Sequence, residues 1–209
     1  LGLMIHEGSH SWFQQMLATN ESTKPWLDEG FTSYAESYVM YQLFPKTNEA
    51  NPFINSLKGY AYFAKSGREE PASWLSDHHD NGTAYSVASY TKGELFLVEL
   101  GYIMGEETLS KVMKKYYQDW HLKHPSDRDF MHIAQQISGM DLKWFYHYWI
   151  NTTKTIDYAI KDVKYGDTYT TITLVNNSDV PMPIDFNVLT KDKKTINYHI
   201  PLKIGRAHV

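Results

Sequence analysis

The chain has 209 residues, a formal net charge of −4 and no cysteine. This length suffices for one sizeable core and a small second domain. Scattered Lys and Arg residues exclude the basic footprint of a nucleic-acid-binding protein, and the absence of Cys excludes disulfides and thiolate chemistry. No apolar run approaches the roughly twenty residues of a membrane-spanning helix, so no membrane segment is predicted in this chain, and its compartment stays open.

The first apolar pattern runs at helical spacing from Leu1 to about Leu17 and contains HEGSH. His6 and His10 are four residues apart, so on a helix their imidazoles lie on one face, close enough to hold one ion. Glu7 lies one step around the helix, beside that ion. The pattern begins without a capping residue or an initiating Met, so we expect a fragment that starts within an element.

A second helix is predicted from about Leu27 to Leu43, after a polar loop that ends at Pro25. If this helix folds back antiparallel to the first, Glu29 supplies a third ligand. Two His and one Glu with an open fourth position are typical of catalytic zinc, whereas structural zinc sites are closed by four ligands, usually with Cys. The alternative is a pair of surface histidines with Glu29 as a solvated charge.

Glu36 lies two helical turns after Glu29 and therefore on the same face. Histidines that bind a metal usually donate their other N–H to a carboxylate, which fixes the tautomer and the orientation of the ring. Glu36 is the candidate for this role, and its alternative is a plain surface charge.

Several motifs resemble one known family: HEGSH, the eighteen-residue gap, WLDEGFTSYAE and AYSVASYTKGELFL. They look like the catalytic domain of the aminopeptidase N family of zinc metallopeptidases, which are gluzincins and also include the bifunctional leukotriene hydrolase. HPSDRDF and ISGMDLKWFYHYWI are similar to the end of that domain. The resemblance covers residues 1–155 and implies a mainly α fold, with a thermolysin-like helical catalytic subdomain. Residues 156–209 resemble only loosely the β-sandwich domain that follows it.

The resemblance implies one zinc ion, held by His6, His10 and Glu29, and a peptide substrate that loses its N-terminal residue. It implies Glu7 as general base, Tyr90 as the catalytic tyrosine before x-Lys-Gly, and Tyr85 as a pocket residue. The family's Gly-x-Met-Glu-Asn strand, whose glutamate grips the substrate's free amino group, does not occur in this chain. An endopeptidase, an epoxide hydrolase and a non-catalytic zinc-binding module therefore stay open, and we expect the fragment alone to be inactive.

The remaining helical region is predicted from spacing and turn residues. Residues 51–66 form a packing helix, and residues 67–82 a loop in which His78 and His79 are exposed rather than bound to a second metal. Ser126 and Asp129 resemble a capping box. Further helices are predicted over TKGELFLVELGYIM, residues 106–124, the stretch from Ser126 to Gly139, and LKWFYHYWI.

After Thr155 the apolar period changes from helical to two. Four short strands are predicted: IDYAIKDV, TYTTITLV, MPIDFNVL and KTINYHI. Pro181 and Pro183 indicate a sheet edge. We expect a small antiparallel sheet, half of a sandwich, without catalytic residues. Gly205 to Val209 break the alternation, and we treat them as a cloning or sequencing scar rather than as fold information.

Overall fold

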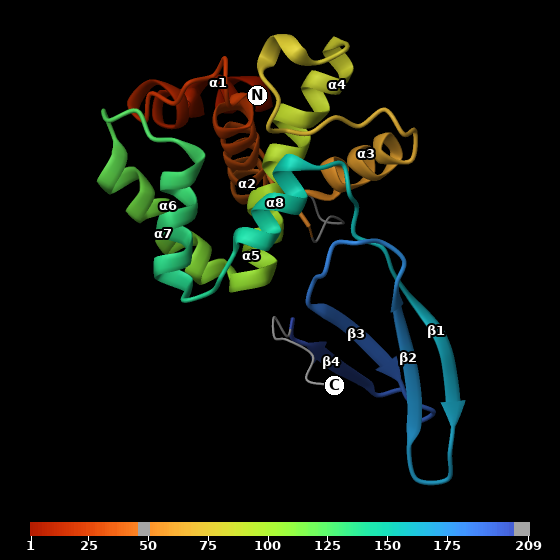
Figure 1. The fold of residues 1–209 in the computed structure, drawn as a ribbon. Helices are drawn as coiled ribbons and strands as arrows, with labels where there is room; N and C mark the ends of the chain where they lie inside the picture. The colour runs from red at the N-terminus through yellow and green to blue at the C-terminus, as the bar shows by residue number, and fades with distance from the viewer. Residues whose placement is uncertain (46–50, 203–209) are drawn as a thin grey trace. The chain divides into compact units, whose positions relative to one another are not determined.

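The structure is a computed structural model that describes residues 1–45 and 51–202. The chain divides into two compact units, Leu1–Thr153 and Lys154–Val209. The first unit is helical and the second carries the β-strands (Figure 1). This confirms the predicted mainly α fold with a small antiparallel β module. Gly205 to Val209 lie outside the described residues.

Over residues 1–45 and 51–153, the helical unit contains eight α-helices, three π-helical turns and one 3-10 turn. In chain order they are α1 (Gly2–His10), η1 (Ser11–Met16), η2 (Trp26–Gly30), α2 (Phe31–Leu43), α3 (Ile54–Ala64), η3 (Ser76–His78), α4 (Gly82–Ser86), η4 (Val87–Thr91), α5 (Lys92–Met104), α6 (Glu106–Trp120), α7 (Asp127–Ser138) and α8 (Lys143–Asn151). The predicted first helix is thus an α-helix that widens into the π-helical η1 after His10.

The ends of α7 show how local sequence sets these boundaries. The capping box is present, with the Ser126 backbone N–H donating to Asp129 Oδ2 over 2.8 Å. This satisfies one of the donors that a helix start leaves unpaired. The helix ends at Gly139, whose φ of +69° is a left-handed conformation that glycine adopts without steric cost.

The core of the unit is aromatic and lies around α5. Phe96 of α5 contacts Trp26 of η2 and Phe145 of α8, with ring centroids 5.0 and 5.3 Å apart. Phe31, at the start of α2, packs edge-on against Phe130 of α7 at 5.0 Å. All five side chains are essentially inaccessible to solvent. Burial of these rings fixes η2 and the start of α2 relative to α5 and the closing helices.

Two glycines let η2 approach α5 backbone to backbone. A Cβ added at Gly93 would lie 2.8 Å from the Cα of Gly30 and 3.0 Å from the carbonyl oxygen of Trp26. A Cβ at Gly30 would meet the backbone of Gly93 at 2.5 Å. Because Glu29 precedes Gly30 and Tyr90 lies three residues before Gly93, this contact brings both side chains to one region.

The β unit consists of two antiparallel hairpins. β1 (Tyr158–Tyr165) pairs with β2 (Thr170–Asn176), and β3 (Ile184–Leu189) pairs with β4 (Thr195–Ile200). Within the described residues these are separate two-stranded sheets rather than the single four-stranded sheet expected. Pro181 and Pro183 lie between the hairpins, and proline has no N–H with which to continue a ladder.

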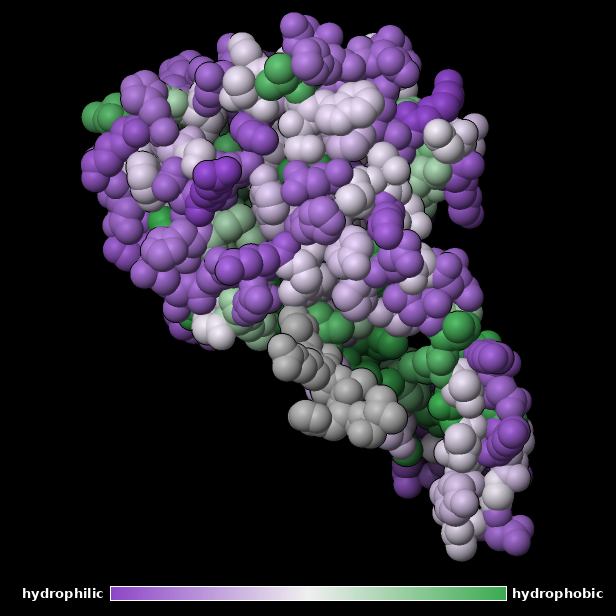
Figure 2. Space-filling model, in the orientation of Figure 1, coloured by the Kyte–Doolittle hydropathy of each residue, from purple (hydrophilic) through white to green (hydrophobic). Residues whose placement is uncertain are grey.

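The surface of the helical unit is mostly hydrophilic on the face shown in Figure 2. Exposed apolar side chains gather on the first two helical elements, where Leu3, Met4 and Trp12 are each at least half exposed. Among residues 1–45 and 51–202, no helix has both the length and the apolar character needed to cross a membrane.

Candidate metal centre

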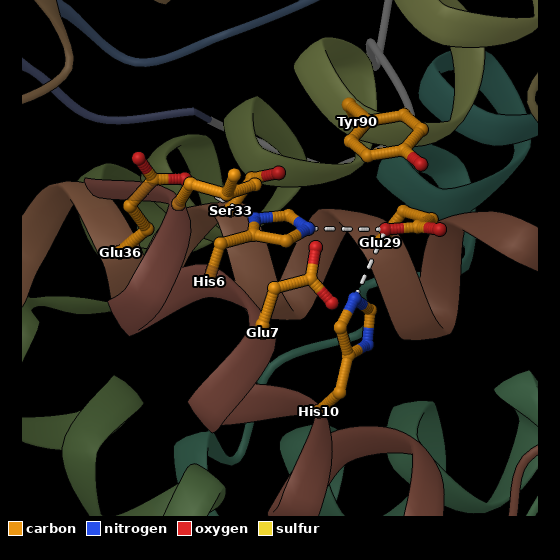
Figure 3. A pocket seen from close by; sticks show the side chains of 8 residues that line it. His6, Glu7, His10, Glu29, Ser33, Glu36 and Tyr90 are labelled. Atoms are coloured by element: carbon orange, nitrogen blue, oxygen red, sulfur yellow. Dashed lines mark hydrogen bonds and ion pairs between the residues drawn. The ribbon is translucent and has the colours of Figure 1, made fainter. Parts of the chain in front are cut away.

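Helix α1 and the turn η2 bring three side chains to one point. The Nε2 atom of His6 lies 3.3 Å from Glu29 Oε2, and the Nε2 atom of His10 lies 3.4 Å from the same oxygen. The two imidazole rings are 4.9 Å apart between centroids. Figure 3 shows both rings directed toward the Glu29 carboxylate. Within the described part of the chain, these three residues form the group whose ligand atoms lie close enough together to hold a metal ion.

The donor set fits zinc in type, and the two separations that involve Glu29 also fit zinc in length. Imidazole nitrogen and carboxylate oxygen bind zinc at about 2.0–2.2 Å, and a tetrahedron with such bonds has donors about 3.3–3.5 Å apart. The separations from Glu29 Oε2 to both nitrogens, 3.3 and 3.4 Å, fall in this range. Three protein ligands leave the fourth corner of the tetrahedron for water or substrate.

Each histidine also contacts a carboxylate through its other nitrogen. His6 Nδ1 lies 3.1 Å from Glu36 Oε2, where the sequence predicted a partner, and His10 Nδ1 lies 2.6 Å from Asp28 Oδ1. With Nδ1–H donated to a carboxylate, Nε2 keeps its lone pair for a metal. Sequence reasoning missed Asp28, although it directly precedes Glu29. Burial raises the pKa of Asp28 to about 6, and the adjacent His10 opposes this shift.

A cavity of about 430 Å³ opens beside the three ligands. Its lining consists of Leu3, His6, Glu7, His10, Glu29, Ser33, Glu36 and Tyr90. The Glu7 side chain is exposed, and its carboxylate lies between the two imidazoles in Figure 3. An exposed carboxylate in the lining of this cavity can exchange protons with a molecule that enters it. Ser33 was also missed by the sequence analysis.

Tyr90 covers the cavity on the side opposite Glu7. Its ring stacks on His6, with centroids 5.8 Å apart and planes 14° from parallel (Figure 3). Burial raises the pKa of Tyr90, and its hydrogen bond to Glu29 raises it further. The phenol therefore stays protonated at neutral pH and can donate a hydrogen bond.

Tyr85 lies behind Tyr90 rather than in the described cavity lining. The two rings meet edge to face with centroids 6.4 Å apart. On its other side Tyr85 packs against His79, at 5.6 Å. The expectation that His79 is exposed is wrong, because its side chain is only 1% exposed and its Nδ1 lies 2.6 Å from a Glu70 oxygen. Loop composition alone did not reveal this burial, which depends on a carboxylate nine residues earlier.

The π-helical turns coincide with the candidate site. Glu29 lies in η2, Tyr90 lies in η4, and η1 begins directly after His10. A π-helical turn contains an extra residue relative to an α-helix and is frequent at functional sites. It changes the direction in which a side chain points without interrupting the helix, so apolar periodicity did not predict it.

A sequence profile described as the "Peptidase family M1 domain" matches residues 2–149, which is more than half of the chain. The chain belongs to peptidase family M1. This confirms the resemblance to the aminopeptidase N family. Among curated M1 relatives, "Aminopeptidase M1-A" of Oryza sativa subsp. japonica is 26% identical over 167 residues, and "Aminopeptidase B" of Rattus norvegicus is 28% identical over 182 residues. Each alignment covers 79% of this chain.

Solved structures of two peptidases share the fold. Aminopeptidase A of Legionella pneumophila, crystallised in complex with aspartic acid, has a TM-score of 0.66 and 18% identity and covers 97% of this chain. The M1 zinc metallopeptidase of Deinococcus radiodurans has a TM-score of 0.59 and 18% identity and covers 71%. The chain spans only 19% and 27% of the two curated relatives, and 23% and 32% of these two structures.

Proposed function

We propose that this chain carries the metal centre of a zinc-dependent aminopeptidase, which releases N-terminal amino acids from peptides. One observation carries the proposal: His6 Nε2, His10 Nε2 and a Glu29 oxygen converge, while each Nδ1 contacts a further carboxylate. In this proposal residues 1–155 are the helical part of the catalytic domain, and residues 156–209 are part of a following β-sandwich domain.

His6, His10 and Glu29 would hold one zinc ion, with Glu36 and Asp28 orienting the two imidazoles. When bound, zinc supplies Lewis acidity, which polarises a scissile carbonyl and lowers the pKa of a water toward neutrality. Both outer carboxylates keep the histidines in the tautomer that presents Nε2 to the ion. Glu36 is one-third exposed, whereas the Asp28 side chain is only 4% exposed. The partner of His10 is therefore the more shielded of the two.

Glu7 is the general base of this proposal. It follows His6 by one residue, and its exposed carboxylate reaches the same cavity. It would take the proton of the attacking water and pass it to the leaving amine, and such a proton-transfer role contributes typically ~10²–10⁴ in rate. Tyr90, protonated and stacked on His6, would donate its O–H to the oxygen that becomes negative during attack.

The arrangement supports an enzyme over a non-catalytic zinc module, because Glu7 and Tyr90 share the cavity of the three ligands. The same residues would also serve an endopeptidase or an epoxide hydrolase. Names of the curated relatives support the aminopeptidase reading, since both the rice and the rat proteins are called aminopeptidases.

The test replaces Glu7 by Gln in the whole natural protein and measures hydrolysis of aminoacyl anilides at full zinc occupancy. We expect kcat to fall by at least about 10²-fold, because Gln keeps the shape but cannot accept the proton. Zinc content should stay at one ion per chain. Glu107→Gln, a substitution at a fully exposed position on α6, is the matched control. Undiminished turnover of the Glu7 variant would end its assignment as base.

A further inference from the structure

Two consecutive carboxylates, Glu69 and Glu70, hold the stretch that carries Tyr85 and Tyr90. This stretch, residues 79–92, is called the tyrosine segment below. Glu70 contacts its first residues and Glu69 contacts its last. Neither glutamate lines the metal cavity, and the function proposed above does not use them.

The Glu69 contact lies at the end of the tyrosine segment, two residues after Tyr90. The Lys92 side chain is fully buried and forms an ion pair with Glu69, whose side chain is 4% exposed. Lys92 Nζ also donates to the Thr152 carbonyl over 2.8 Å, and Tyr60 donates its hydroxyl to the same Glu69 oxygen over 2.9 Å. A buried charge is tolerated only with such partners, so these contacts fix Lys92 closely.

The Glu70 contact lies at the start of the segment. One Glu70 oxygen lies 2.6 Å from His79 Nδ1, and the other accepts the backbone N–H of Asp80 over 3.1 Å. Asn81 follows at once and caps α4 by accepting from two backbone N–H groups. Glu70 thereby fixes both the His79 ring and the entry into the helix that carries Tyr85.

A continuous row of rings leads from this loop to the metal centre. His79 packs on Tyr85 at 5.6 Å, Tyr85 on Tyr90 at 6.4 Å, and Tyr90 on His6 at 5.8 Å between centroids. A displacement of the His79 ring would therefore reach Tyr90 through the ring of Tyr85. Tyr90 itself lies in the π-helical η4, and such turns are rare in proteins but frequent at functional sites.

We propose that Glu69 and Glu70 are positioning residues, which clamp the tyrosine segment at both ends and hold the Tyr90 hydroxyl over the metal centre. The Cα atoms of Glu69 and Glu70 are consecutive and therefore about 3.8 Å apart. The Glu69–Lys92 and Glu70–His79 contacts consequently cannot shift independently of each other. The loop that carries Glu69 and Glu70 is held to α8, because the Ser73 N–H donates to the Ile150 carbonyl over 3.0 Å. This inference rests on the role proposed above for Tyr90.

The experiment is a double-mutant cycle in the whole natural protein. Glu70→Gln is expected to lower kcat by about 10- to 100-fold with KM and zinc content nearly unchanged, since a misplacement of about 1 Å can cost ~10²-fold. In a Tyr90→Phe background, Glu70→Gln should lower kcat almost no further, because the hydroxyl that Glu70 positions is absent. An equal loss in both backgrounds would overturn the proposal, since it would show that Glu70 acts through general structure.

A second readout follows Tyr90 itself by fluorine NMR of protein labelled with fluorotyrosine. The Tyr90 resonance, identified by its loss in Tyr90→Phe, should shift or broaden in Glu70→Gln and stay in place in Glu107→Gln. An unmoved resonance would overturn the clamp. If Tyr90→Phe leaves kcat unchanged, the catalytic role proposed for Tyr90 fails, while the resonance still decides whether Glu70 positions it.

Glu69 requires a different substitution, because Glu69→Gln alone leaves the buried Lys92 without its counter-charge. Replacing Glu69 and Lys92 together by Met keeps a similar side-chain volume and removes both charges. This variant should fold and bind zinc, yet show a lowered kcat and a broadened Tyr90 resonance, because the directional contacts to Tyr60 and Thr152 are lost. An unchanged kcat and an unchanged Tyr90 resonance would show that Glu69 does not position the tyrosine segment.

Discussion

Gly93→Ala tests whether the close approach of η2 and α5 assembles the site. The added Cβ would lie 2.8 Å from Gly30 Cα and 3.0 Å from the Trp26 carbonyl oxygen, both of them backbone atoms. Neither can rotate away as a flexible side chain would, so the two elements must separate. Such overpacking lowers the free energy of unfolding by about 1–3 kcal/mol. The higher helix propensity of Ala raises it by about 0.5–1 kcal/mol.

The net expectation is a loss of up to about 2.5 kcal/mol in the free energy of unfolding, measured by urea titration of the zinc-free protein. Separation of η2 from α5 also moves Glu29 away from the histidines of α1, so zinc affinity should fall in the same variant. Gly59→Ala is the matched control, because Gly59 lies within α3 and nothing lies within 4 Å of its added Cβ. This control should gain about 0.5–1 kcal/mol and keep its zinc affinity.

Two results would show that the contact between Gly30 and Gly93 does not have this role. If Gly93→Ala were as stable as Gly59→Ala, the tight backbone contact would not constrain the fold. If Gly93→Ala lost stability but bound zinc with unchanged affinity, the contact would matter for the core without placing Glu29.

Three further predictions concern the metal and a buried acid. Glu36→Ala should weaken zinc binding about 10- to 100-fold in chelator competition, because His6 loses the carboxylate that orients it, and an unchanged affinity would remove Glu36 from the site. Zinc removal by a chelator should lower thermal stability reversibly, since an ion present at 100 times its Kd contributes about 2.7 kcal/mol, and an unmoved melting temperature would argue against a structured site. Burial raises the pKa of Glu99 in α5 to about 7, so the folded state retains a proton that the unfolded state loses from about pH 4.5. Stability should therefore fall as pH rises from about 4.5 to 7 by about 1–3 kcal/mol, and Glu99→Gln should flatten this slope in unfolding titrations, whereas an unchanged slope would assign it to other groups.

The sequence predicted best those features that depend on neighbours along the chain. His6 and His10 share a helical face because they are four residues apart, and the capping box at Ser126 needs only a carboxylate three residues later. The family, and with it the mainly α fold, was recognisable from HEGSH and WLDEGFTSYAE. Each of these signals lies within a short window, where local geometry decides the outcome.

Features that depend on contacts between segments far apart in the sequence were not predicted. Asp28 lies in the π-helical η2 and contacts His10 of the preceding helix, and a pattern of apolar residues records neither the extra residue in such a turn nor a contact over eighteen residues. The burial of His79 depends on Glu70, which reaches it across a loop whose composition is that of an exposed segment. The separation of the strands into two hairpins is likewise a matter of which strands pair, which the alternation within each strand does not specify.

Anomalous diffraction from crystals of the zinc-loaded protein, collected on both sides of the zinc absorption edge, would locate the ion itself. We expect a single strong peak within about 2.0–2.2 Å of His6 Nε2, His10 Nε2 and a Glu29 oxygen, with the fourth position open to solvent. A peak bound by four protein side chains, or one that leaves Glu29 outside bonding distance, would contradict this expectation.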